Sequence, residues 1–71
     1  MKVLVTGVGG QLGFDVMNEL AKRGHRGIGS DVLSEITNSE MEYIQMDITD
    51  ANAVNDVISR IKPEAVIHCA A

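Results

Sequence analysis

Residues 2–13 read Lys2-Val3-Leu4-Val5-Thr6-Gly7-Val8-Gly9-Gly10-Gln11-Leu12-Gly13. The β-branched, almost uncharged run at the start predicts a buried strand, and the glycines predict a tight turn into a helix. A strand, a glycine turn and a helix in this order present free backbone N–H groups to a pyrophosphate. Gly7 would permit the sharp turn, Gly10 would let phosphates approach the backbone, and Gly13 would let the helix pack closely on the strand.

The spacing of these glycines is Gly-x-x-Gly-x-x-Gly, which differs from the commoner Gly-x-Gly-x-x-Gly fingerprint. Such a pattern alone is weak evidence, because a glycine-rich turn that binds nothing has the same sequence. Asp31 strengthens it, since it lies 18 residues after Gly13, close to where dinucleotide-binding domains carry a ribose-binding acid. Together these features predict a dinucleotide site.

The spacing of apolar residues predicts the other elements. A first helix begins near Leu12 with apolar positions Leu12, Val16 and Leu20, and Gly24 supplies a stop. Strands are expected over residues 26–30 (ending at Asp31), 42–46 and 65–69, with a loop over 32–41. The second helix is expected to be capped by Thr49 or Asp50, to end at Pro63 and to have an apolar face of Val54, Val57, Ile58 and Ile61.

The order β-α-β-loop-β-α-β predicts parallel strands joined by right-handed crossovers. The fold class is therefore α/β: the N-terminal portion of a Rossmann-like doubly wound parallel sheet, with four strands in the order 3-2-1-4 and two helices. The fourth strand is as apolar as a central strand, yet this chain supplies nothing to cover it. We therefore expect residues 1–71 to be the N-terminal part of an NAD(P)-binding Rossmann domain in a longer protein. The alternative is a short domain that covers this edge as a homodimer.

Composition narrows the classes of partner. The net charge is −4 and the six basic residues are scattered, which argues against nucleic acid or an anionic membrane as partner. The sequence contains no apolar run long enough to span a membrane. Cys69 is the single cysteine, so an internal disulfide is impossible and a cytoplasmic location is predicted.

Three more segments are candidates for contact with a cofactor. The Asp31 carboxylate could accept hydrogen bonds from both adenosine ribose hydroxyls, and its charge would favour NAD over NADP; the alternative is a turn aspartate. Asp47 and Ile48 follow the third strand, where they could bind the adenine amino group and ring, unless Asp47 only begins a helix or turn. The small residues Cys69, Ala70 and Ala71 would let a cofactor lie against the backbone, or they simply pack tightly.

Other reactive residues lack partners in the sequence. Cys69 is expected to be a small buried hydrophobe rather than a nucleophile. His25 and His68 have no metal-ligand spacing to other residues, so no metal is expected. Tyr43 is followed four residues later by Asp47, so the chain has no Tyr-x-x-x-Lys pair, and no Walker signature is present either. We therefore predict no catalytic residue within this chain.

The segment Lys2 to Gly13 resembles the extended short-chain dehydrogenase/reductase superfamily. Within it, Gly10-Gln11-Leu12-Gly13 is similar to the dTDP-4-dehydrorhamnose reductase family, whereas sugar-nucleotide epimerases and dehydratases more often carry Gly-Phe-Ile-Gly there. The short segment between the second and third strands, residues 46–49 and residues 62–71 also resemble the reductases. The resemblance covers essentially the whole chain, but only the cofactor half of such an enzyme.

The resemblance implies NADH or NADPH as cofactor and reduction of the 4-keto group of a dTDP-4-keto-6-deoxy sugar to give dTDP-L-rhamnose. It implies cofactor contacts from Gly10, Gln11 and Leu12 at the pyrophosphate, Asp31 at the ribose, Asp47 and Ile48 at adenine, and Cys69 to Ala71 at the diphosphate. The family's catalytic Thr/Ser, Tyr and Lys would lie beyond Ala71. The alternatives are a sugar-nucleotide epimerase or dehydratase, a non-catalytic reductase-like regulatory subunit, and a structural module without nucleotide.

Overall fold

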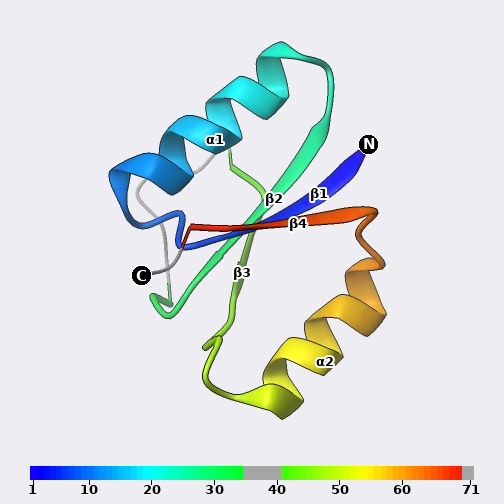
Figure 1. Ribbon diagram of the computed structural model, residues 1–71. Coiled ribbons are helices and arrows are strands. Elements are labelled where there is room, and N and C mark those ends of the chain that lie inside the picture. Colours follow the sequence, from blue (N-terminus) through cyan, green and yellow to red (C-terminus); the bar gives the residue numbers. More distant parts are fainter. Residues whose placement is uncertain (35–40, 70–71) are drawn as a thin grey trace.

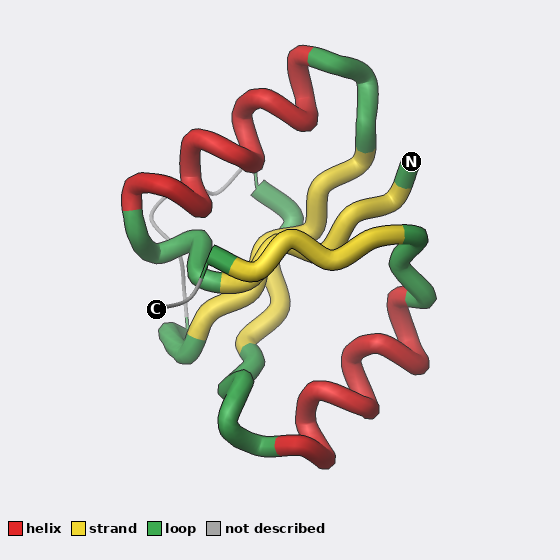
Figure 2. The backbone as a smooth tube through the Cα atoms, viewed as in Figure 1, coloured by secondary structure: helices red, strands yellow, loops and turns green. Residues whose placement is uncertain are grey.

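The computed structural model describes residues 1–34 and 41–69. These residues form four strands and two helices: β1 (Lys2–Thr6), α1 (Gln11–Lys22), β2 (Arg26–Asp31), β3 (Tyr43–Gln45), α2 (Ala51–Ile61) and β4 (Ala65–His68). The strands form one parallel sheet in the order β3-β2-β1-β4, so the predicted fold class and strand order are confirmed. Helix α1 covers one face of this sheet and α2 covers the other (Figures 1 and 2).

β1 lies at the centre of the sheet and contributes to a core on both faces. On the α1 side the buried residues are Val3, Val5, Val8 and Met17, and on the α2 side they are Leu4, Ile28, Met46 and Val57. This division follows from the alternation of side chains along a strand, which sends neighbouring residues of β1 to opposite faces. At the end of β1, Thr6 pairs with Ser30 on one side and with His68 on the other. The carboxyl ends of three strands therefore meet at one edge of the sheet.

The two helices begin in different ways. The Asp50 side chain caps α2 by accepting hydrogen bonds from the backbone N–H groups of Asn52 and Ala53, which confirms one of the two predicted caps. At α1 the N-cap is Gly10, and no described side chain caps it. α2 ends at Ile61, before Pro63 as predicted.

Two residues that were expected on apolar helix faces are exposed. Leu12 is 65% exposed and Ile58 is 39% exposed, whereas Gly13, Met17 and Val57 are buried. Each helical residue is rotated by about 100° from the last, so a neighbour of a buried position can point away from the sheet. The prediction that Leu12 and Ile58 face the core was therefore wrong.

Strand lengths also differ from the prediction. β3 covers only Tyr43–Gln45 instead of residues 42–46, because its ladder with β2 is limited to the partners of Gly29, Ser30 and Asp31. β4 ends at His68 rather than at residue 69. Of the predicted loop over 32–41, residues 35–40 lie outside the described residues.

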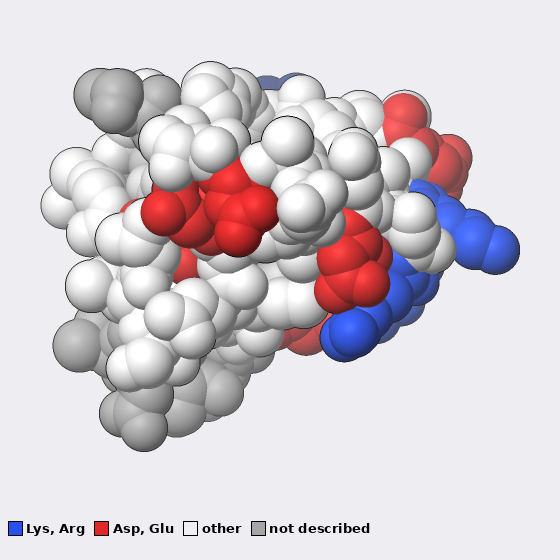
Figure 3. Space-filling view, turned by 90° about the horizontal axis from the view of Figure 1, so that it is seen from below, with Lys and Arg blue, Asp and Glu red and all other residues white. Residues whose placement is uncertain are grey.

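Charged side chains are unevenly distributed over the surface seen in Figure 3. Acidic groups extend from the middle of this face toward one end of it, where Lys and Arg also gather. On α2, Arg60 and Asp56 form an exposed ion pair at 3.2 Å. Neither helix of the described chain has the length and apolar character to cross a membrane.

Candidate functional site

The glycine turn between β1 and α1 is held tightly against the sheet. Gly7 has a φ of 79°, a left-handed conformation that favours glycine, and its N–H donates to the carbonyl of Ser30 at 2.8 Å. A Cβ atom at Gly13 would lie 2.3 Å from the carbonyl oxygen of Gly7, so only glycine lets α1 approach the turn this closely. These structural roles of Gly7 and Gly13 agree with the prediction.

The start of α1 is open on the side of this turn. A Cβ atom at Gly10 would meet only the Gly7 carbonyl oxygen, at 3.7 Å, so the space above Gly10 is free of described side chains. The first N–H groups of any helix lack partners within the helix and carry a partial positive charge. In α2 the Asp50 side chain satisfies two of them, those of Asn52 and Ala53, whereas no described side chain does so in α1. The α1 N-terminus can therefore bind an anion.

A cleft of about 470 Å³ opens at this place, along the carboxyl edge of the sheet. Its lining combines the last two residues of β2 with residues that follow each of the four strands: Gly7, Gly10, Ser30, Asp31, Val32, Met46, Asp47, Ile48, Thr49 and Cys69. Six of these were predicted from the sequence, namely Gly7, Gly10, Asp31, Asp47, Ile48 and Cys69. The other four, Ser30, Val32, Met46 and Thr49, were not predicted, although each directly precedes or follows a predicted site residue.

The Asp31 carboxylate lies at the mouth of the cleft and contacts the glycine turn. Its Oδ2 accepts a hydrogen bond from the Gly9 N–H at 2.8 Å, and its Oδ1 accepts one from the Val32 N–H at 2.7 Å. A carboxylate has about four lone-pair sites, so about two remain for further donors. The contact also explains why residue 9 is a glycine, because a Cβ atom there would lie only 2.8 Å from Oδ2 of Asp31.

Asp47 lies on the rim of the cleft and forms a local turn. Its Oδ1 accepts hydrogen bonds from the Thr49 hydroxyl at 2.7 Å and from the Thr49 N–H at 2.9 Å. The hydroxyl bond, followed by the backbone bond, lowers the pKa of the Asp47 carboxyl below its usual value. The turn interpretation of Asp47 is thus correct, and its side chain also lines the cleft beside Ile48.

The end of β4 closes the cleft on the β1 side. The Cys69 N–H donates to the Thr6 carbonyl at 3.1 Å, and Thr6 Oγ1 lies 2.8 Å from Nδ1 of His68. Cys69 is half-buried rather than fully buried. The predicted contact residues Ala70 and Ala71 lie outside the described residues.

Three predicted residues do not line the cleft with their side chains. The Gln11 amide donates to Asp15 Oδ1 at 2.9 Å along the surface of α1, and Leu12 is exposed. Gly13 is buried beneath the turn. In this arrangement Gln11 and Leu12 are placed to contribute to an anion site through their backbone N–H groups.

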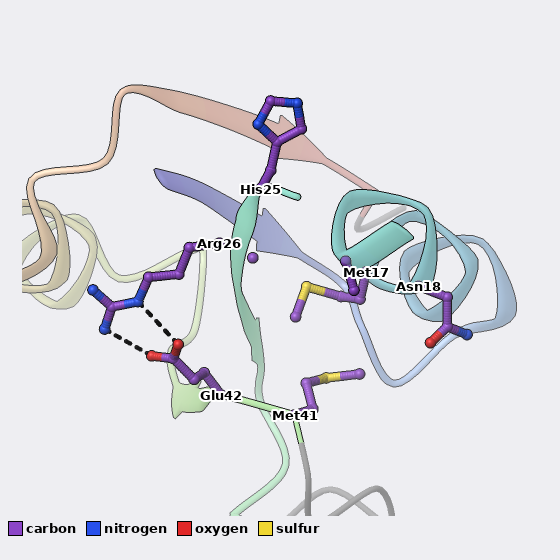
Figure 4. Close-up of a pocket in the computed structure, with 8 residues that line it drawn as sticks. Met17, Asn18, His25, Arg26, Met41 and Glu42 are labelled. Atoms are coloured by element: carbon purple, nitrogen blue, oxygen red, sulfur yellow. Dashed lines mark hydrogen bonds and ion pairs between the residues drawn. The ribbon is translucent and has the colours of Figure 1, made fainter. Parts of the chain in front are cut away.

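A second hollow, of about 400 Å³, lies at the opposite end of β2 (Figure 4). It is lined by residues of α1, the turn after it, the start of β2 and the two residues before β3, among them Met17, Asn18, His25, Arg26, Met41 and Glu42. Its two charged groups neutralise each other, because the Arg26 guanidinium forms two hydrogen bonds of 2.9 Å with the Glu42 carboxylate. These hydrogen bonds lower the pKa of Glu42 and raise that of Arg26. Across residues 1–34 and 41–69, no group of three or more His, Cys, Asp or Glu side chains could hold a metal ion.

A sequence model of the NAD dependent epimerase/dehydratase family matches residues 3–71. The chain belongs to this family. It is 31% identical over 97 residues to a UDP-sulfoquinovose synthase of Sulfolobus acidocaldarius, covering 99% of this chain and 25% of the relative. It is 34% identical over 80 residues to a UDP-glucose 4-epimerase of Mycolicibacterium smegmatis, covering 100% of this chain and 25% of the relative.

A solved structure with the same fold is that of a Thermus thermophilus UDP-glucose 4-epimerase in complex with NAD. It superimposes with a TM-score of 0.86 at 28% identity and covers 100% of this chain and 24% of that chain. The chain thus spans about a quarter of the length of the relatives that it matches.

Proposed function

We propose that this chain binds NAD(H) in the cleft at the carboxyl edge of the sheet, as the N-terminal part of an enzyme that acts on a nucleotide sugar. The observation that carries the proposal is the start of α1, which has no described side-chain cap and opens into a cleft with Asp31 at its mouth. A helix N-terminus suits a phosphate, and a carboxylate suits the hydroxyls of a ribose. The relatives with UDP-sugar names and the solved structure with NAD support the same function.

The residues fit a dinucleotide in the following way. The diphosphate would lie against the backbone of Gly10, Gln11 and Leu12. The cleft is lined by acidic residues and by no Lys or Arg among the described residues, so backbone N–H groups would carry most of the neutralisation. Cys69 to Ala71 would line the other side of the diphosphate. The nicotinamide would supply hydride transfer when the cofactor is bound.

The adenosine end would be bound by the two acids at the edge of the cleft. Asp31 would accept hydrogen bonds from the ribose hydroxyls with the lone pairs that Gly9 and Val32 leave free. Asp47 and Ile48 would flank the adenine. The negative charges of Asp31 and Asp47 would repel the 2′-phosphate of NADPH, so NADH is the favoured cofactor.

This proposal is tested by titrating the protein that carries this segment with NADH and NADPH. The Asp31→Asn substitution keeps the size of the side chain and removes its charge. We expect it to weaken NADH binding about tenfold or more, because hydrogen bonds to charged groups contribute about 1.5–3 kcal/mol. NADPH binding should change less. Asp56→Asn on α2, an acid outside the cleft lining, is the matched control and should leave both affinities unchanged. Absence of saturable NADH binding to the unsubstituted protein would refute the proposal.

For the reaction we propose reduction of a dTDP-4-keto-6-deoxy sugar, supported by the similarity of Gly10-Gln11-Leu12-Gly13 to the reductases. Epimerisation of UDP-glucose is the second candidate, supported by the 34% identity to a UDP-glucose 4-epimerase. Oxidation of NADH with the dTDP-keto sugar would support the first. Conversion of UDP-glucose to its 4-epimer without net NADH oxidation would support the second.

The 71-residue chain alone should show neither activity, because the reductases' catalytic residues would lie beyond Ala71. A homodimer and a cytoplasmic location stay predictions from the sequence.

A further inference from the structure

The segment that follows β2 is held by side chains of β3. The backbone pairing between β2 and β3 ends at the partners Asp31 and Gln45. Beyond this point the chain leaves the sheet, so the carbonyl groups of Val32 and Leu33 have no ladder partner in β3. Two side chains replace the ladder. The Tyr43 hydroxyl shares its single hydrogen between the carbonyl oxygens of Leu33 and of Asp31, which lies at 3.0 Å, and the Gln45 amide donates to the carbonyl oxygen of Val32 at 2.9 Å.

Every carbonyl from residue 31 to residue 33 is therefore bound by a donor from β3 or the residue after it. The Met46 N–H also donates to the Asp31 carbonyl, at 2.9 Å. The aromatic ring of Tyr43 packs against the buried cluster on the α1 side, so its hydroxyl is attached to a fixed part of the core. Burial, and secondly the charge of Asp31, raise the pKa of Tyr43, which keeps the hydroxyl protonated and able to donate.

This arrangement determines where the Asp31 carboxylate lies. Asp31 contacts Gly9 only through its side chain, at 2.8 Å, and the direction of that side chain depends on the backbone of residues 31–33. A carboxylate that is already held in the geometry of the bound state loses little conformational entropy when the ligand binds, so the affinity is higher. We propose that Tyr43 and Gln45 are positioning residues that hold Asp31 over the Gly9 N–H and so set the affinity for an unphosphorylated adenosine ribose. The ribose part of this inference rests on the proposed function.

The test compares Tyr43→Phe and Gln45→Ala with Glu42→Gln in the protein that carries this segment. Tyr43→Phe removes only the hydroxyl, while the Asp31 carbonyl keeps its bond from Met46. Glu42→Gln weakens the Arg26 ion pair, which joins the first residue of β2 to the residue before β3, away from the Asp31 end of the sheet. It therefore controls for a general loosening of the β2–β3 pairing.

Two readouts separate the inference from the proposed function. The first needs no nucleotide: hydrogen exchange at the Gly9 amide should become about three- to tenfold faster in Tyr43→Phe, and faster in Gln45→Ala, as expected for loss of about one hydrogen bond. In Glu42→Gln it should stay within about twofold of the original rate. The second readout is nucleotide affinity: the NADH dissociation constant should rise about three- to tenfold in Tyr43→Phe and that of NADPH should rise less.

Each outcome decides a separate point. Unchanged Gly9 exchange in both Tyr43→Phe and Gln45→Ala would overturn the positioning role, and so would an equal effect of Glu42→Gln. If Tyr43→Phe does not fold, the exposed Gln45→Ala truncation decides the matter alone. Failure of the unsubstituted protein to bind NADH would refute the proposed function and the ribose part of the inference, while Gly9 exchange still decides the positioning.

Discussion

Substitution of Gly13 by alanine tests whether close packing of α1 on the glycine turn holds this edge of the sheet together. The added Cβ would lie 2.3 Å from the Gly7 carbonyl oxygen, about 1 Å closer than the 3.4 Å at which ordinary contact begins. It would also lie 2.8 Å from the carbonyl carbon of Gly7 and from Cα of Val8. All three atoms belong to the backbone, so a side-chain rotation cannot relieve the overlap. The turn and the helix must move apart.

Two opposing effects determine the size of the loss. In an exposed helix, replacing glycine with alanine stabilises by about 1 kcal/mol, because alanine restricts the unfolded chain. Inserting a methyl group into a filled site costs about 1–3 kcal/mol, and contact with backbone atoms puts Gly13 at the upper end. We therefore expect Gly13→Ala to lower the free energy of unfolding by about 2 kcal/mol.

Urea denaturation of the protein that carries this segment measures this change, and Gly10→Ala is the matched control. At Gly10 the nearest atom would be 3.7 Å from the new Cβ, and its φ of −92° suits alanine. Its stability should fall by only about 0.5 kcal/mol, from the weaker helix cap. Because Gly10 lines the cleft, its methyl group should instead weaken NADH binding. A Gly13→Ala protein as stable as the original, or more stable, would refute the packing argument.

Two further predictions concern the start of α2 and the rim of the cleft. Asp50→Ala removes the acceptor of the Asn52 and Ala53 N–H groups, so urea denaturation should show a loss of about 1 kcal/mol; an unchanged midpoint would contradict the capping role. Thr49→Val removes the shorter of the two hydrogen bonds to Asp47, so the pKa of Asp47 should rise toward its usual value in an NMR titration. Since folding lowers this pKa, the charged carboxylate stabilises the fold at neutral pH, and that contribution is lost as the pH falls through the folded pKa. Thr49→Val should reduce this acid dependence, and an unshifted titration would show that the hydroxyl bond is absent in solution.

Much of the fold could be predicted because its signals are local. β1, the glycine turn and the two helices lie within or close to the predicted boundaries, since hydrophobic spacing and capping act over a few residues. The predictions were wrong where the structure of a segment depends on the elements packed beside it. Whether Leu12 is exposed depends on which side of α1 packs against the sheet. The length of β3 depends on how many of its residues pair with β2.

The sequence by itself determined the strand order and the uncapped N-terminus of α1. It also determined six of the residues that line the cleft, which were predicted from the glycine spacing and from their positions after strands. Those features depend on short-range chemistry and on the handedness of βαβ units, which holds for nearly every such chain. Only the tertiary structure decided that the Asp31 carboxylate reaches Gly9 and that Tyr43 and Gln45 hold the segment behind it. These contacts join residues 10 to 22 positions apart along the chain, and their geometry follows from the register of neighbouring strands, which no local pattern encodes.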